Sequence, residues 1–234
     1  MKHSKRYNAV AEKTRKGGPF TVDQGLELLK ASASAKFDET AEVVFRLGVD
    51  PRHSDQQVRG TVVMPNGTGR KVKILVLAKG EKIKEAEEAG ADFVGGEDYV
   101  AKIQGGWLEA DTIIATPDMM KDVGKLGKIL GPRGLMPNPK TGTVTFDITK
   151  AVGEAKAGKV EYRTDKTANV HVVFGKSSFE IEQLKGNLME LTREIIRVKP
   201  AAAKGVYMKK VSISTTMGPG IALDIASLVD ESKQ

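Results

Sequence analysis

Hydrophobic and polar residues follow two different periodicities along this chain. Between residues 41 and 49 every second position is apolar and most of its neighbours are polar, which is typical of an antiparallel strand with one face buried. Ahead of it, Thr21 and Gln24 have the spacing of a capping box, which predicts a helix that runs to about Ala33. A second strand is expected at residues 59–64.

The middle of the chain has a different pattern, in which short continuous apolar runs alternate with segments of helical character. We expect strands at 72–78, 93–94 and 112–115, and helices at 81–89, 97–103, from about 118, and at 148–157. Strands without alternation, separated by helices, predict a parallel sheet covered on both faces.

After the middle segment, the pattern returns to that of the beginning. Residues 159–163 and 170–174 are expected to pair as a hairpin, followed by a helix at 180–198 and a last strand at 206–215. The pattern changes at Pro65, Asn66 and Gly67 and again near Gly158, residues that bend chains easily. The predicted fold class is therefore an α+β outer domain, residues 1–66 and 159–234, with an inserted α/β domain at 67–158 and a hinge at these four residues.

Composition restricts the functional classes. The 234 residues include 40% apolar residues, enough for a substantial core, and no cysteine. The absence of cysteine excludes disulfides, a thiolate zinc site and a cysteine nucleophile. No apolar run reaches the roughly 18–20 residues of a membrane span, and the first ten residues are polar and basic. We expect a soluble, unexported protein.

Charge points to a polyanionic partner. The net charge is +7, the sign expected for a protein that binds nucleic acid. Residues 1–70 hold 12 Lys and Arg against 8 Asp and Glu, residues 159–234 hold 12 against 9, and residues 71–158 hold 13 of each. The excess positive charge therefore belongs to the two outer segments, which favours the outer domain as the binding domain.

Motifs for catalysis are scarce. The chain lacks the acyl-transfer, zinc-hydrolase and complete P-loop motifs, and His3, His53 and His171 are scattered along it. The Gly-rich stretch 67–71 precedes a strand, whereas nucleotide-binding loops follow one. We expect no enzyme activity, metal or cofactor. A nucleotide-binding enzyme that uses the parallel sheet remains the alternative.

Other segments suit RNA. At 212–220, hydroxyl residues alternate with apolar ones and end in glycines, and hydroxyls are suited to ribose 2′-OH groups; the alternative is a plain strand and turn. The loop 131–142 is rich in proline and glycine and carries Arg133 and Lys140, so it is either a rigid connection or a second RNA contact. With only 5% aromatic residues, structured RNA is a better candidate than a stacked single strand.

Four separated segments resemble a known family. They are residues 50–60 (DPRHSDQQVRG), 131–142 (GPRGLMPNPKTG), 162–166 (YRTDK) and 212–218 (SISTTMG). Together they resemble bacterial large ribosomal subunit protein one, the family that forms the mobile stalk beside the tRNA exit site. The chain departs from the family pattern at Gln57, where Asn is commoner, and at 167–169, where a glycine is common.

The resemblance implies a cytoplasmic protein of the large ribosomal subunit, monomeric when free, with a Rossmann-like inserted domain. Its implied partners are large-subunit ribosomal RNA, exit-site tRNA that it helps to move and release, and the messenger of its own operon, which it represses. The implied RNA-binding residues of the outer domain are Lys36, Phe37, Thr40, Arg52, Lys166, His171, Ser212, Ser214, Thr216, Met217 and Gly218. No catalysis is implied.

Overall fold

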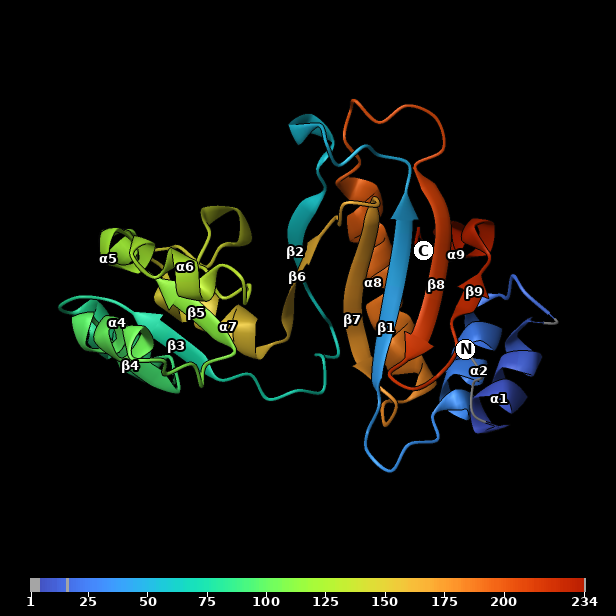
Figure 1. Cartoon of the computed structure of the whole chain (residues 1–234), viewed down its shortest axis with the longest axis horizontal. Helices are drawn as coiled ribbons and strands as arrows, with labels where there is room; N and C mark the ends of the chain where they lie inside the picture. The colour runs from blue at the N-terminus through green and yellow to red at the C-terminus, as the bar shows by residue number, and fades with distance from the viewer. Residues whose placement is uncertain (1–4, 16, 234) are drawn as a thin grey trace. The chain divides into compact units, whose positions relative to one another are not determined.

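The structure, a computed structural model, describes residues 5–15 and 17–233 of the chain. The chain divides into two compact units. Unit 1 contains the chain up to Gly69 and from Val160 onward, and unit 2 is Arg70–Lys159 (Figure 1). Within the described part of the chain, no helix combines the length and the apolar character needed to cross a membrane.

Unit 1 is built on a four-stranded antiparallel sheet in the order β7-β1-β8-β9. The strands are β1 (Thr40–Leu47), β7 (Asn169–Lys176), β8 (Met208–Thr215) and β9 (Ile221–Leu223). Residues of β1 alternate between the core and the opposite face, as the sequence predicts. The inward residues share one core with α2 (Val22–Ser32) and α8 (Ile181–Arg197), and Figure 1 shows α8 behind β7 and β1.

Helix starts in unit 1 follow local sequence signals. The predicted capping box of Thr21 and Gln24 opens α2, and Asp224 caps the last helix through the N–H of Ser227. Four elements of unit 1 were not predicted: the first helix, the last helix, the short helix η1 and the short strand β9. The remaining elements of unit 1 are α1 (Lys5–Arg15), η1 (Ser54–Gln56), β2 (Arg59–Val63), β6 (Lys159–Arg163) and α9 (Ile225–Glu231).

The expected hairpin of residues 159–163 with 170–174 is wrong. β6 pairs with β2 in a separate two-stranded sheet, whereas β7 pairs with β1. A bridge between Thr164 and Val170 and a hydrogen bond from the N–H of Asp165 to the carbonyl of Asn169 at 2.8 Å close the turn between the two segments. The turn between them contains Ala168 with a φ of 64°, and this left-handed residue helps to redirect the chain from one sheet to the other.

Unit 2 contains a three-stranded parallel sheet in the order β4-β3-β5. On β3, Leu75 and Leu77 belong to one apolar core, while Ile74 and Val76 belong to another. Both faces of the sheet are thus covered, as the continuous apolar runs predict, and the predicted fold class is confirmed. Unit 2 comprises β3 (Ile74–Leu77), α3 (Lys82–Glu88), β4 (Phe93–Gly95), α4 (Glu97–Gln104), β5 (Thr112–Ala115), η2 (Pro117–Met119), α5 (Met120–Gly124), α6 (Gly127–Leu130), η3 (Pro139–Thr141) and α7 (Ile148–Lys156).

Candidate nucleic-acid interface

The face of the unit 1 sheet that points away from α2 and α8 carries the strand residues proposed to contact RNA. The alternation of β1 turns its even-numbered residues, 40–46, toward this open face. Strand pairing places His171 on one side of Val44 and Ser212 on the other. Ser214 lies two positions further along the same face of β8. The fold thus gathers residues from three distant segments of the sequence.

One end of this face is formed by the loop before β1 and the loop after β8. The hydroxyl oxygen of Thr216 accepts a hydrogen bond from the N–H of Thr40 at 3.0 Å, and the N–H of Thr216 donates to the carbonyl of Thr40 at 3.1 Å. The N–H of Met217 donates to the carboxylate of Glu39 at 3.0 Å. We call this the Phe37 end, and its residues are Lys36, Phe37, Thr40, Thr216, Met217 and Gly218.

The Phe37 end presents apolar side chains to solvent. Phe37 is 55% exposed and Met217 is 51% exposed, so both side chains are available to a partner. A flat ring and a flexible thioether can pack against bases. A Cβ at Gly218 would lie 2.4 Å from the Thr215 hydroxyl oxygen, so the close packing of this turn requires glycine there.

The opposite end of the sheet carries a cleft of about 370 Å³ with three cationic side chains. We call it the Arg52 end; its lining residues are Pro51, Arg52, Gln57, Arg163, Thr164, Asp165 and Lys166. The loop that holds Arg52 is fixed by the side chain of Asp50, which accepts from the N–H of Arg52 at 3.0 Å. Arg163 was not among the predicted binding residues, although it lies inside one of the motifs.

Asp165 organises the turn beside this cleft. Its carboxylate accepts from the backbone N–H groups of Thr167 and Asn169, both at 2.8 Å. Burial by itself raises the pKa of Asp165, but the hydrogen bonds from Asn169 and Thr167 outweigh it and hold that pKa well below the usual range. The side chain is therefore a permanent anion that offsets part of the positive charge of the Arg52 end.

The two ends are far apart. β1 runs from Thr40 to Leu47, and seven steps of about 3.3 Å give roughly 23 Å between them. The residues implied by the resemblance are therefore not one compact cluster. Lys36, Phe37 and 216–218 lie where β1 begins and β8 ends, and Arg52 and Lys166 lie in the loops after β1 and before β7. Figure 1 shows these two ends of the sheet, with its open face between them.

The two histidines that the structure describes lie on the surface, each beside a carboxylate. The side chain of His53 is 66% exposed and lies 4.0 Å from Asp50. That of His171 is 56% exposed and lies 3.6 Å from Asp165. His3 lies outside the described residues.

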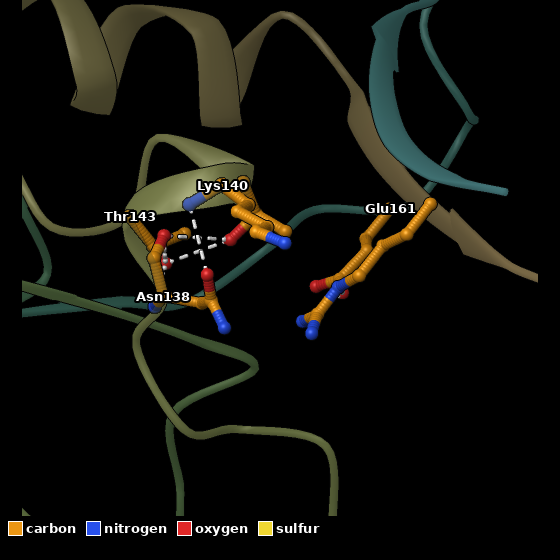
Figure 2. Close-up of polar contacts among 6 residues, drawn as sticks. Asn138, Lys140, Thr143 and Glu161 are labelled. Carbon is orange, nitrogen blue, oxygen red and sulfur yellow. Dashed lines mark hydrogen bonds and ion pairs between the residues drawn. The ribbon is translucent and has the colours of Figure 1, made fainter. Parts of the chain in front are cut away.

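In unit 2, the loop that carries Arg133 and Lys140 is held by hydrogen bonds of its own. The side-chain oxygen of Asn138 accepts from the N–H of Lys140 at 2.8 Å, and the N–H of Asn138 donates to the Thr143 hydroxyl at 2.8 Å (Figure 2). Both cationic side chains are exposed. By contrast Arg59, on β2 of unit 1, donates to Glu161, also drawn in Figure 2, at 2.6 Å, so its charge is already paired.

The proposed hinge residues have structural partners. The side chain of Asn187, which is fully buried on α8, accepts from the N–H of Asn66 at 3.0 Å and donates to the carbonyl of Gly67 at 2.9 Å. Sequence reasoning did not identify Asn187. Asn66 and Gly67 are thus anchored to unit 1, while Gly158, with a φ of 95°, follows the end of α7.

The nucleotide-binding alternative can be tested at the carboxyl end of the parallel sheet, where such ligands bind. Lys79 follows β3, and its ammonium group lies 2.9 Å from a carboxylate oxygen of Glu97 and 3.6 Å from one of Asp122. Two carboxylates at this edge disfavour a phosphate group. The geometry therefore argues against the enzyme alternative.

An antiparallel sheet with an open polar face, exposed apolar side chains at one end and cations at the other suits an RNA-binding protein. Residues 29–219 match the family model of the Ribosomal protein L1p/L10e family. Because this match covers most of the chain, the protein belongs to that family. Its members are structural proteins of the ribosome, so this chain binds ribosomal RNA in the large subunit and serves translation.

Proposed function

We propose that unit 1 binds two RNA molecules at once, one at each end of its sheet. The Phe37 end and the adjoining open face would hold large-subunit ribosomal RNA at the mobile stalk, and the Arg52 end would hold deacylated tRNA at the exit site. The observation that carries this proposal is the separation of the two groups of residues by the length of β1.

The Phe37 end suits a permanent RNA partner. Phe37 and Met217 offer exposed apolar surface, and Ser212, Ser214 and Thr216 offer hydroxyl groups. These contacts depend on the shape and the 2′-OH groups of the RNA rather than on total charge. Short-range contacts of this kind lead to slow dissociation and selectivity, as a ribosomal RNA site requires.

The Arg52 end suits a partner that comes and goes. Arg52, Arg163 and Lys166 line an open cleft, and cations of this kind bind phosphate groups without regard to sequence. A site dominated by charge can accept any tRNA and release it again. This arrangement supports a role in movement and release of deacylated tRNA.

Repression of the operon would use the Phe37 end. A messenger that imitates the ribosomal RNA structure must compete for the same short-range contacts, whereas tRNA must not. Two partners that share one end exclude each other, and partners at different ends form a ternary complex.

The test is a competition experiment with labelled large-subunit ribosomal RNA bound to the protein. Operon messenger should displace the label, and deacylated tRNA should instead add to the complex. Arg52→Gln combined with Lys166→Gln should weaken tRNA binding and lower the slope of log affinity against log salt by about 1 for each lost phosphate contact. Ribosomal RNA affinity should change far less. Displacement of ribosomal RNA by tRNA, or equal loss of both RNAs in the double variant, would contradict the assignment.

A secondary RNA contact at Arg133 and Lys140 is the proposed role of the unit 2 loop. The hydrogen bonds around Asn138 hold the loop while both cations remain exposed. Arg133→Gln with Lys140→Gln should lower the salt slope of ribosomal RNA binding, and Lys84→Gln, an exposed cation on α3, serves as the control. A slope that falls equally in the control would mean that the loop acts only as a rigid connection.

A further inference from the structure

A buried carboxylate lies within the Phe37 end, where the partner is a polyanion. Glu39 is 1% exposed. One of its oxygens accepts from the N–H groups of Ser34 and Ala35, both at 2.8 Å, and the other accepts from the N–H of Met217 at 3.0 Å. Glu39 therefore connects the loop that leads to Lys36 and Phe37 with the loop that carries Thr216 and Met217.

These hydrogen bonds keep the side chain ionised in spite of its burial. Burial by itself raises the pKa of Glu39, but the backbone N–H groups of Ala35 and Met217, the Thr215 hydroxyl and the N–H of Ser34 outweigh it, and the pKa is lowered from its ordinary value. Hydrogen bonds to an ionised acceptor are about twice as strong as those between neutral groups. The connection between the loops is therefore strong near neutral pH.

The charge of Glu39 has the wrong sign for a direct contact with RNA. A carboxylate near phosphate groups weakens binding, and removing it should strengthen binding by electrostatics alone. Both acceptor atoms also point to backbone N–H groups of the protein. A contribution of Glu39 to binding must therefore act through the loops that it connects.

We infer that Glu39 is a positioning residue, which holds the two loops of the Phe37 end in the arrangement that RNA requires before RNA arrives. The inference rests on the proposed function of that end. A site ordered in advance loses less conformational freedom on binding and gains affinity for that reason. Without the carboxylate, Phe37 and Met217 would have to be ordered by the RNA itself.

Two variants separate positioning from charge. Glu39→Gln removes the charge and leaves one oxygen acceptor, so its amide group can satisfy the N–H groups of one loop but not those of both. Glu39→Asp keeps the charge and shortens the side chain by one methylene, so the carboxylate cannot reach both loops from the same backbone. Electrostatics predicts stronger binding by Glu39→Gln and unchanged binding by Glu39→Asp, whereas positioning predicts a loss in both.

The experiment measures the affinity of the full chain for deproteinised large-subunit ribosomal RNA, with small-subunit ribosomal RNA as competitor. Both Glu39 variants should bind about tenfold more weakly, the change expected from one lost charge-assisted hydrogen bond. The salt slope should stay unchanged. Glu27→Gln removes an equal charge from the exposed side of α2 and should bind as tightly as the parent or more tightly.

Amide hydrogen exchange on the free protein provides a readout that does not depend on RNA. Exchange should rise at Ser34 and Ala35, at Met217, or at both places, while the core of β1 and α8 keeps its protection. Glu39→Gln binding as tightly as the parent, or faster exchange throughout unit 1, would overturn the inference. A parent protein that does not prefer large-subunit RNA would refute the proposed function instead, and the loop-specific exchange would still establish the connection.

Discussion

Replacement of Thr216 by valine tests whether the last strand reads RNA or only completes the sheet. The hydroxyl oxygen of Thr216 accepts from the N–H of Thr40 at 3.0 Å and lies 3.5 Å from the carbonyl oxygen of Thr40. The second distance is too long for a strong bond. One lone pair is therefore engaged within the protein, and the hydroxyl proton and the other lone pair remain available to a ribose.

The structure separates two costs of the substitution. Valine keeps the shape of the side chain but removes the acceptor for the Thr40 N–H, which should lower the free energy of unfolding by about 0.5–1.5 kcal/mol. Because Thr216 is exposed, water can replace the lost acceptor, and we expect a value near the lower limit. Leaving an RNA polar group unpaired should cost about 1–3 kcal/mol of binding, or about 5- to 150-fold in affinity.

The assay is a salt titration of affinity for large-subunit ribosomal RNA, with melting curves to show that each variant is folded. Thr216→Ser keeps the hydroxyl group and serves as the matched control, with affinity close to that of the parent. Thr216→Val should lose affinity equally at all salt concentrations, since no phosphate contact is removed. If valine binds like threonine, or if serine loses as much as valine, the hydroxyl does not read RNA and the strand end is only structural.

Four other predictions concern the units and their turns. Replacing residues 70–159 by a short Gly-rich linker should leave one cooperative melting transition and most of the ribosomal RNA affinity, because the core of unit 1 is complete without unit 2. A product that does not fold, or that folds and does not bind RNA, would disprove this prediction. Distances between fluorescent labels on the two units should be broadly distributed in single free molecules, and one narrow peak in free and bound protein would exclude a hinge. Ala168→Gly should raise the free energy of unfolding of unit 1 by about 0.5–1 kcal/mol in denaturant titrations. Glycine removes the cost of about 1–2 kcal/mol that a left-handed conformation imposes on an L-residue, and the greater freedom of glycine in the unfolded chain offsets about 0.4–1 kcal/mol of this gain. A destabilised variant would show that Ala168 is not strained. Because the pKa of Asp165 is lowered in the folded chain, the ionised carboxylate stabilises the fold fully above its ordinary pKa of 3.8, and this stabilisation is lost as pH falls below that value. Asp165→Asn should therefore flatten the dependence of the melting temperature on acid pH. An unchanged dependence would contradict the role of Asp165 in holding the turn.

Much of the architecture was determined by the sequence alone. The alternation in residues 41–49 correctly identified the half-buried strand β1, and the spacing of Thr21 and Gln24 located the start of α2. The continuous apolar runs of the middle segment correctly predicted a parallel sheet with two covered faces. These features depend on side-chain periodicity and capping within a few residues, and such signals are local.

Only the tertiary structure decided which segments lie together. The pattern of residues 159–163 predicted a strand but not its partner, and the expected hairpin gave way to pairing with β2. In the same way the resemblance supplied the binding residues, but the register of β1 with β7 and β8 decided that His171 lies beside Val44 and Thr216 beside Thr40.

The residues that hold the site could not be found from the sequence for the same reason. Glu39 and Asn187 have no distinctive neighbours in the chain, and their roles come from partners such as Met217, 178 positions from Glu39, and Asn66, 121 positions from Asn187. Such hydrogen bonds exist only after the strands and helices have packed, because burial is what makes an unpaired N–H group costly and a well-placed acceptor strong.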